Sequence, residues 1–433
     1  MTAMQYGILG CIALVVLLLS SMPVAFVMAM VGLVGFALIV DPSAAANMMT
    51  SEMYQTLAST SLTVIPLFVL MGQVAFHAGI SRRLFHAAYC WLGPLPGGLA
   101  MATVGACTAF GAICGSGPAT AATMAAVALP EMRRYRYNMV LATGTVASGG
   151  TLGMMIPPSV VFIVYGIITE QSVGKLFISG IMPGVLTAAL FCLAIYAICR
   201  RHPEMGPPAP PMSLRERVGS LAGVSETLVL FVLVMGGMFA GFFSPNEAAA
   251  IGAAGSILIA LVRRQLSWSM LYQSLMETAR TSCMVMVIVA GAMVFGRFLA
   301  VTQLPHDLAS WLAGLPLPSW VIMLCIIFFY VVSGCFVDAL ALVLLTVPIF
   351  YPVVLQMGYD PIWFGVVMVL VTQIGVITPP VGVCAYVVSG MQKEVPLERV
   401  FRGCLPFLIV LVVVSVLLLA FPQIALLLPN MIK

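Results

Sequence analysis

The stretch Gly153-Met-Met-Ile-Pro157-Pro158 lies inside an apolar segment that runs over 138–168, and it decides the fold. It recurs 222 residues later as Gly375-Val-Ile-Thr-Pro379-Pro380, inside a second apolar segment over 361–390. A proline pair removes two backbone N–H donors, so both segments are predicted to be helices that break near their middle. Unwound backbone at membrane depth is tolerated only where protein buries it or where it lines a cavity. The predicted breaks therefore cover 150–158 and 375–380.

The composition indicates that lipid is the main solvent of this chain. Of its 433 residues, 62% are hydrophobic and 7% are charged, and the mean hydropathy is +1.13. Soluble domains typically carry about 25% charged residues, so no soluble core could bury this much apolar surface. The net charge of +4 comes from short basic clusters between apolar segments; such clusters are typical of topology signals and do not indicate nucleic-acid binding. The eleven cysteines are scattered and are interpreted as free thiols.

Apolar stretches of about 20 residues are long enough to cross a bilayer as helices. The longer stretches 94–130 and 318–352 carry small or polar residues near their middle. The stretches 43–60 and 265–280 are more polar and are predicted to lie along the membrane surface as amphipathic helices. The other predicted spans are 6–22, 24–40, 61–80, 138–168, 176–199, 223–243, 248–262, 281–300, 361–390 and 404–428.

Basic residues set the predicted sidedness, because cytoplasmic loops carry an excess of Lys and Arg. Arg83 and Arg133 flank 94–130, so this stretch enters and leaves from the cytoplasmic side as a hairpin or an even pair of spans. The loops 301–318 and 353–360 contain no Lys or Arg, so the stretch between them enters and leaves from the outer side. One hairpin therefore opens to each side of the membrane.

Further matches relate the two halves of the chain. Pro130 and Pro352 are 222 residues apart, as are Pro23 and Pro245, and Gly115 matches Gly334 with one small gap. Because the spans of the two halves run in opposite directions, we predict an all-α polytopic membrane protein with an inverted-topology repeat, two re-entrant helical hairpins and two broken helices. The predicted units are 1–60 and 223–280 for scaffold and arm helices, 61–168 and 281–390 for the hairpins and broken helices, 169–222 for a span and a cytoplasmic linker, and 391–433 for the last span.

Polar residues gather at the predicted hairpin tips. The first tip, within 111–123, carries Ser116 and Thr120, and the second carries Asp338 shortly after Gly334. Each tip is predicted to face its own broken helix and to form one small-cation site. Hydroxyls and carbonyls without a cluster of carboxylates suit Na⁺ better than Ca²⁺, and helix N-termini at the midplane favour an anionic substrate. The alternative for Ser116, Thr120 and Thr378 is a hydroxyl bonded to its own helix backbone.

Three charged residues have their own interpretations. Asp338 is the carboxylate placed deep in an apolar stretch, and it is predicted to serve a cation, a proton or a hydroxylated substrate, with helix capping as the alternative. Arg297 is predicted to extend its guanidinium toward the interface, with a carboxylate partner as the alternative. Glu247 follows Ser244-Pro-Asn and is predicted to complete a capping box.

No pattern in the sequence indicates catalysis. Gly174-Lys175 lacks the upstream glycine of a Walker A loop, and the four His residues are dispersed without an HExxH motif. We therefore expect no enzyme activity, no catalytic residue and no cofactor.

Five runs in the sequence carry a family resemblance. They are GAICGSGPATAAT, GGTLGMMIPPSVVFIVYG, SPNEAAAIGA, DALALVLLTVPIFYPVV and IGVITPPVGVCAYV, in this order. The chain resembles, over essentially its whole length, the large membrane subunit of TRAP transporters, the tripartite ATP-independent periplasmic transporters. Many relatives have Ser-Ser-Ala at the first tip, whereas this chain has Ser116-Gly117-Pro118, so a backbone contribution is expected there in place of a second hydroxyl.

The resemblance implies Na⁺-coupled uptake of an organic acid by an elevator mechanism in the bacterial inner membrane. Family substrates are C4-dicarboxylates, sialic acid, other sugar acids and keto acids. The implied partners are a small four-helix membrane subunit, expected as a separate chain, and a periplasmic substrate-binding protein. The residues expected to contact substrate are Ser116, Thr120 and Asp338. The implied Na⁺ ligands are Ser116, Gly153, Ile156 and Pro158 at the first site, and Gly334, Gly375, Thr378 and Pro379 at the second.

Three alternative functions stay open from the sequence. A stand-alone Na⁺/dicarboxylate symporter has the same inverted hairpins but transports without a binding protein. An intramembrane enzyme needs a buried nucleophile with a base, or a metal cluster. An ion channel is also compatible with two hairpins that enter from opposite faces.

Overall fold

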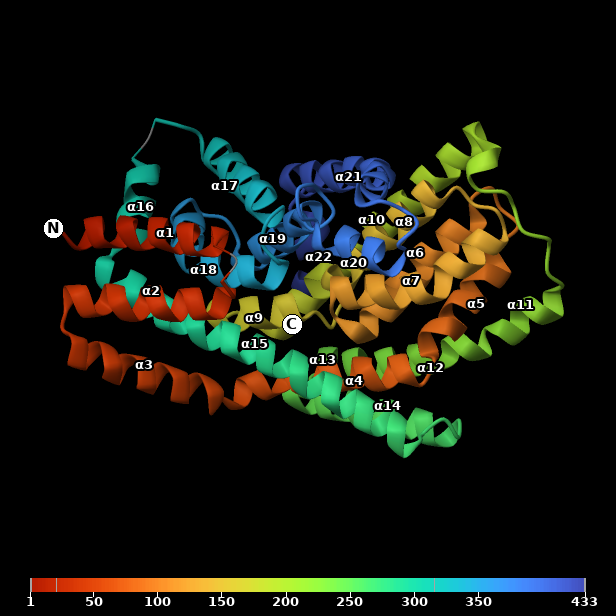
Figure 1. Ribbon diagram of the computed structural model, residues 1–433, viewed down its shortest axis with the longest axis horizontal. Coiled ribbons are helices and arrows are strands. Elements are labelled where there is room, and N and C mark those ends of the chain that lie inside the picture. Colours follow the sequence, from red (N-terminus) through yellow and green to blue (C-terminus); the bar gives the residue numbers. More distant parts are fainter. Residues whose placement is uncertain (1, 21, 315, 432–433) are drawn as a thin grey trace.

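The computed structural model describes residues 2–20, 22–314 and 316–431, and within these ranges the chain is helical without a β-strand (Figure 1). Eight helical runs among these residues are long and apolar enough to cross a membrane. The chain is therefore a multi-pass membrane protein. The remaining apolar helices are shorter and either pair as hairpins or pack beside the long ones.

The helices fall into two series that follow the two predicted repeats. The first series is α1 (Ala3–Leu19), α2 (Val24–Ile39), α3 (Pro42–Leu57), η1 (Thr60–Thr63), α4 (Val64–His77), α5 (Ile80–Leu92), α6 (Gly98–Cys114), α7 (Gly117–Arg134), α8 (Met139–Met155), α9 (Val160–Ile168) and α10 (Val173–Arg201). A linker with η2 (Pro203–Met205) and α11 (Leu214–Ser220) follows. The second series is α12 (Ala222–Phe231), η3 (Val232–Gly236), α13 (Gly237–Phe239), α14 (Pro245–Val262), α15 (Trp268–Thr302), α16 (Leu304–Ala313), α17 (Ser319–Gly334), α18 (Ala339–Gln356), α19 (Pro361–Gly375), α20 (Val383–Met391), α21 (Leu397–Ala420) and α22 (Gln423–Met431).

Both hairpins and both broken helices form, but the first break is shorter than the predicted 150–158, because 150–155 stays in helix α8. Helices α6 and α7 turn back on each other across Gly115, whose positive φ of 66° suits glycine. Helices α17 and α18 do the same across 335–338. The first broken helix separates into α8 and α9, and the second separates into α19 and α20, each at its Pro–Pro pair.

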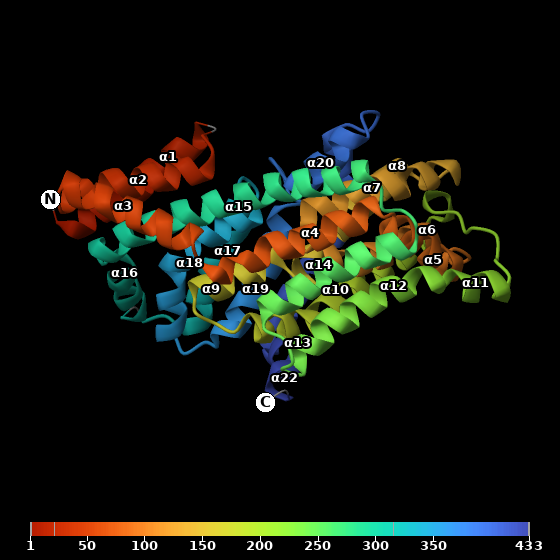
Figure 2. The same ribbon diagram turned by 90° about the horizontal axis from the view of Figure 1, so that it is seen from below.

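Each repeat packs one of its helices against a helix of the other repeat. Helix α2 of the first repeat packs against α15 of the second, and α14 of the second repeat packs against α4 of the first (Figures 1 and 2). Glycine allows the backbones to approach closely: a β-carbon on Gly32 would lie 2.9 Å from the carbonyl oxygen of Val294. A β-carbon on Gly291 would meet the carbonyl of Ala25. These helix pairs therefore join the two repeats into one framework.

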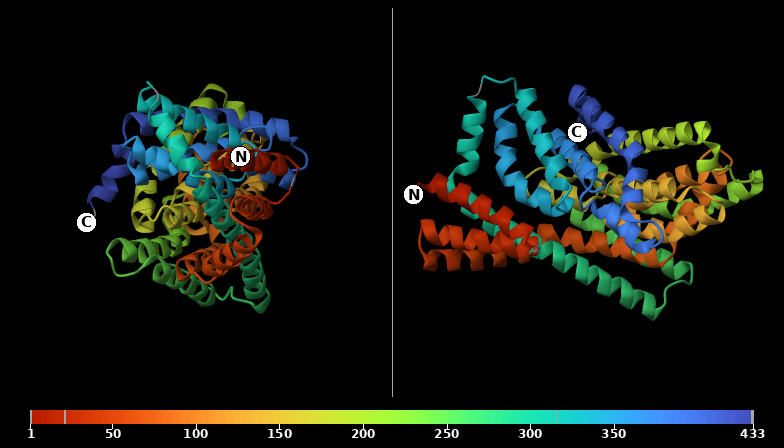
Figure 3. Two further views of the ribbon diagram at one scale, coloured as in Figure 1. Left: turned by 90° about the vertical axis from the view of Figure 1, so that its left-hand side faces the viewer. Right: turned by 45° about the horizontal axis from the view of Figure 1, so that its top comes forward.

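The ends of the molecule differ in charge as the sequence predicted. The basic residues Arg83, Arg134 and Arg263 line one shared cavity at the end that carries α5 and α11. Helix α16, from the loop without Lys or Arg, lies at the opposite end beside the N-terminus (Figure 3). This arrangement agrees with one basic face and one face without basic clusters.

Two expectations about helices were wrong. Residues 265–280 do not form a separate surface helix, because α15 continues without a break over 35 residues. Good helix formers run through this region, and no proline or glycine stops the helix before its core-facing part. The short helices α5 and α16 occupy corresponding places before the two hairpins, and their moderate hydrophobicity concealed them among the loops.

Arg297 has a carboxylate partner instead of extending alone to the interface. Its Nε donates to Oε1 of Glu52 on α3 at 2.6 Å, and Glu52 is 6% exposed. The pair lies 245 residues apart in the chain, so local sequence could not indicate it. Glu247 behaves as predicted, because it completes a capping box with Ser244 at the start of α14.

Arg297→Met should destabilise the protein, because it leaves the buried carboxylate of Glu52 without its donor at a cost of about 1–3 kcal/mol. The measurement is the thermal unfolding midpoint of the purified protein in detergent. Arg280→Met is the matched control, because Arg280 is an exposed arginine on the same helix without an ion pair among the described residues. The double variant Glu52→Gln/Arg297→Met should recover part of the loss; equal midpoints for all variants would refute the pair's contribution.

Candidate functional site

The first candidate site is the junction where the tip of the α6–α7 hairpin meets the break between α8 and α9. Gly111 on α6 and Gly153 on α8 touch backbone to backbone, since a β-carbon on Gly111 would lie 2.7 Å from Cα of Gly153. The N–H of Val160, the first residue of α9, donates to the carbonyl of Gly115 at 3.3 Å. Hairpin tip and broken helix therefore form one continuous backbone contact.

Oxygen atoms converge above Gly153. A β-carbon on this glycine would lie 2.6 Å from Oγ1 of Thr120 and 2.9 Å from the carbonyl oxygen of Ser116. Thr120 is 0% exposed, and its hydroxyl has no hydrogen-bond partner among the described residues, although the weakly bonding thiol of Cys114 lies beside it. A buried hydroxyl without a strong partner is costly, so the Thr120 hydroxyl would gain from a ligand.

The break itself supplies further carbonyl groups. Ile156 leaves the helix with an extended backbone (φ −75°, ψ 125°), so its carbonyl has left the α8 hydrogen-bond ladder. The carbonyl oxygen of Pro158 faces Gly115, and a β-carbon there would lie 2.6 Å from it. Ser159 secures the start of α9 by donating to the carbonyl of Met154 at 2.6 Å. The first set of expected ligands, Ser116, Gly153, Ile156 and Pro158, thus lies at one junction.

The second junction repeats this construction between the α17–α18 hairpin and the α19–α20 break. Gly334 meets Gly375, and a β-carbon on Gly375 would lie 2.7 Å from the carbonyl oxygen of Gly334. The N–H of Val381 donates to the carbonyl of Cys335 at 3.2 Å. Gly111 thus meets Gly153 as Gly334 meets Gly375, whereas Gly115 and Cys335, the neighbour of Gly334, accept the equivalent N–H bonds from the two breaks.

Two polar side chains at the second junction bond to their own helices. Oγ1 of Thr378 donates to the carbonyl of Ile374 at 2.6 Å, which is the alternative considered for this residue. Asp338 caps α18, and its Oδ2 accepts from the N–H of Leu340 at 3.1 Å. Both groups keep free lone pairs for a ligand. The hydroxyl of Ser116 makes no capping bond at the start of α7.

The two junctions differ in exposure. Pro157 and Pro158 at the first break are buried, whereas Pro379 and Pro380 at the second break are exposed. The structure therefore closes the first break inside the protein and leaves the second open on one side.

Thr151 and Gln373 connect the two broken helices. Their side chains lie 3.2 Å apart, both are 0% exposed, and they are separated by the 222 residues of the repeat itself. Residues related by a two-fold axis touch each other only close to that axis. The Thr151 hydroxyl donates to the carbonyl of Ser148 at 2.7 Å and also faces Oε1 of Gln373 at 3.2 Å. Sequence reasoning missed this contact, although the common spacing was visible.

The donor groups at the first junction are neutral oxygens, and the second junction adds the carboxylate of Asp338 to its neutral oxygens. Among the described residues no three His, Cys, Asp or Glu side chains gather as a metal cluster. Hydroxyls and backbone carbonyls in a dehydrated setting suit a hard monovalent cation better than a transition metal. The residue types at the junctions therefore fit Na⁺.

The fold and its two junctions define a membrane transport protein of the inverted-repeat class. Residues 11–424 match the family of the tripartite ATP-independent periplasmic transporter, DctM component. The chain belongs to this family.

Three named proteins illustrate the similarity. The C4-dicarboxylate TRAP transporter large permease protein DctM of Pseudomonas aeruginosa is 38% identical over 88% of both chains. The sialic acid TRAP transporter large permease protein SiaM of Vibrio cholerae is 34% identical over 96% of both. The isethionate TRAP transporter permease protein DctMQ of Oleidesulfovibrio alaskensis is 36% identical over 86% of this chain and 58% of its own length.

A solved structure supports the fold. The YdaH transporter of Alcanivorax borkumensis superposes with a TM-score of 0.64 at 16% identity, and covers 89% of this chain and 90% of its own. At this identity the likeness concerns the fold alone.

Gly153→Ala should destabilise the protein by roughly 1–3 kcal/mol, because the new methyl group overlaps Thr120 and the Ser116 carbonyl in a packed junction. The measurement is the thermal unfolding midpoint in detergent. Gly296→Ala is the matched control, since a β-carbon there meets nothing within 4 Å. A Gly153→Ala midpoint equal to that of the control would show that the junction is loosely packed.

Proposed function

We propose that this chain is the large membrane subunit of an organic-acid uptake system that is driven by Na⁺. The observation that carries the proposal is the convergence of oxygens over Gly153, with the buried Thr120 hydroxyl lacking a strong partner. A cation at this position replaces its lost water with protein oxygens. The pseudo-symmetric junction at Gly375 provides a second such position.

Each ion would take its ligands from a hairpin tip and from the break of the adjacent broken helix. At the first position Ser116, Gly153, Ile156 and Pro158 provide backbone and hydroxyl oxygens, and Thr120 adds its hydroxyl. At the second position the ligands are Gly334, Gly375, Thr378 and Pro379. Because each ion joins a hairpin to a broken helix, Na⁺ binding would hold the two elements in one arrangement.

The substrate is an organic anion that lies between the two tips. Helices α7 and α18 both begin at a tip, and the positive end of a helix dipole attracts a carboxylate. The hydroxyls of Ser116 and Thr120 would donate to the anion, or would contact it together with the bound Na⁺. Asp338 would accept from a hydroxyl group of the substrate. Relatives named for C4-dicarboxylate and for sialic acid support this class of substrate.

Transport would follow an elevator mechanism in the bacterial inner membrane. The helix pairs α2–α15 and α14–α4 form the framework, and the hairpins with their broken helices move against it. The unequal exposure of the two breaks supports a structure that is open at only one of them.

Two partners complete the proposed system, a periplasmic substrate-binding protein and a small membrane subunit. Membership of a tripartite family supports both partners. The small subunit is proposed as a separate chain.

Na⁺ should stabilise the purified chain against thermal unfolding, and K⁺ at equal ionic strength should not. Saturation of one site at 100 times its dissociation constant adds about 2.7 kcal/mol. Thr120→Val should remove about half of the Na⁺ effect, because it keeps the shape but deletes one hydroxyl of one site. Thr103→Val is the control, since Thr103 is also buried but its hydroxyl bonds to Leu99 of its own helix at 2.8 Å. Equal stabilisation by K⁺ would contradict Na⁺ sites.

Asp338→Asn should abolish uptake while the protein folds normally, because asparagine caps a helix as well as aspartate does but carries no charge. The measurement is uptake of a radiolabelled organic acid into proteoliposomes that contain the complete tripartite system under an inward Na⁺ gradient. Asp360→Asn is the control, since Asp360 caps α19 in the same manner. If Asp338→Asn transports normally and Asp338→Ala does not, the carboxylate serves only as a cap.

A further inference from the structure

A cavity of about 1050 Å³ lies apart from both junctions, at the basic end of the molecule. Its walls come from α5, from the α6–α7 hairpin near its base, and from α11 and α12. The deepest α7 residue that lines it is Ala126, ten residues beyond Ser116, which is about 15 Å along a helix. The cavity is therefore separate from the proposed cation and substrate sites.

The lining of this cavity is amphipathic. Apolar side chains form its body, among them Phe85, Leu99 and Val127. Tyr89 and Tyr135 meet at one wall, where their hydroxyl groups lie 2.7 Å apart. Trp91, on the same helix as Tyr89, is 46% exposed and donates to the carbonyl of Arg217 on α11. Aromatic residues with polar tips are typical of the interface between hydrocarbon and headgroups.

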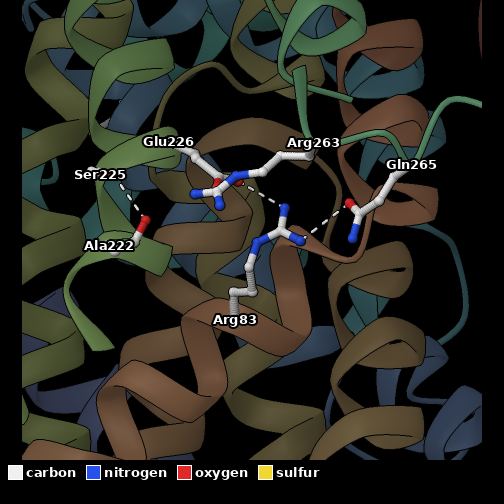
Figure 4. A network of polar contacts seen from close by, with 6 residues as sticks. All are labelled: Arg83, Ala222, Ser225, Glu226, Arg263 and Gln265. Carbon is white, nitrogen blue, oxygen red and sulfur yellow. Dashed lines mark hydrogen bonds and ion pairs between the residues drawn. The ribbon is translucent and has the colours of Figure 1, made fainter. Parts of the chain in front are cut away.

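The cavity holds more positive than negative charge at its rim. Four arginines line it, and two of them, Arg83 and Arg263, share the buried carboxylate of Glu226 (Figure 4). Arg83 also donates to Gln265 at 3.2 Å. The carboxylate of Glu226 offsets one of these two positive charges and holds both arginine side chains in place within the protein.

The other two arginines are exposed and only weakly compensated. Arg134 has its carboxylate partner, Glu131, at 3.9 Å, and both side chains are solvent-accessible, so the pair is weak. Arg82 has no carboxylate partner among the described residues. Glu216, the remaining acid in the lining, is engaged by Ser213 in a capping box. Arg82 and Arg134 are thus available to a ligand.

We propose that this cavity binds an anionic phospholipid of the cytoplasmic leaflet, with its phosphate at Arg82 and Arg134 and its acyl chain along the apolar wall. Basic pockets between membrane helices on the cytoplasmic side recognise anionic headgroups. A soluble acid would match the arginines but not the apolar body of the cavity. Because the site joins the hairpin base to α11 and α12, the lipid occupies the boundary across which the hairpin would move in an elevator.

Native mass spectrometry of the purified chain with added phosphatidylglycerol tests the site. One anionic lipid should remain bound in preference to phosphatidylethanolamine. The variant Arg82→Gln/Arg134→Gln should bind about 25-fold more weakly, because each arginine near an anionic surface contributes about a factor of five. Arg200→Gln/Arg201→Gln is the matched control, since it removes the same charge from an exposed basic pair outside the cavity.

A second variant keeps the test independent of charge. Ala126→Phe fills part of the cavity from an exposed position on α7 and should also reduce phosphatidylglycerol retention, with an unchanged unfolding midpoint in lipid-free detergent. The proposal is overturned if both cavity variants retain the lipid as the control does. It is also overturned if millimolar succinate displaces the wild-type adduct, because the site then belongs to a soluble acid.

Discussion

Every backbone N–H and C=O in the hydrocarbon region must find its partner within the protein, and this chain interrupts two of its membrane helices. The interruption at each Pro–Pro pair leaves carbonyls outside a helical ladder. In both cases the tip of a re-entrant hairpin packs against the break, and a glycine of the hairpin touches a glycine of the broken helix. A side chain at Gly153 or Gly375 would separate the two backbones. The close contact between glycines therefore allows non-helical, polar backbone to remain inside this membrane protein.

The inverted repeat provides this junction twice and joins its copies at the centre. Thr151 and Gln373 meet at the shared spacing of 222 residues, so the two broken helices touch near the pseudo-two-fold axis. Away from the axis, framework helices of one repeat pack against framework helices of the other, and these contacts join the two halves. The hairpin tips differ, because 335–338 is longer than the two-residue turn at Gly115 and Ser116. The second tip carries Asp338 at the N-cap of α18, where the first tip carries Ser116 at the N-cap of α7.

Much of this architecture could be predicted because it depends on local signals. Proline pairs predicted the breaks, and the distribution of arginines predicted one hairpin from each side. The composition predicted a membrane protein, and the ordered runs predicted the family to which the chain belongs. All of these are properties of short stretches or of whole-chain counts.

What escaped prediction depends on contacts between distant residues. The pair of Arg297 and Glu52 spans 245 residues, and nothing near Arg297 in sequence indicates an acid. The close contact of Gly111 with Gly153 was not predicted, because it depends on how the hairpin packs against the broken helix. The continuity of α15 reflects helix packing along its whole length rather than the polarity of 265–280.

The most direct measurement is the number of ²²Na⁺ ions that the purified chain binds at equilibrium, counted by scintillation proximity with K⁺ and Ca²⁺ as competitors. Two oxygen-rich junctions predict two saturable ions per chain that excess K⁺ does not displace. Absence of saturable ²²Na⁺ binding, or equal displacement by K⁺, would contradict the account.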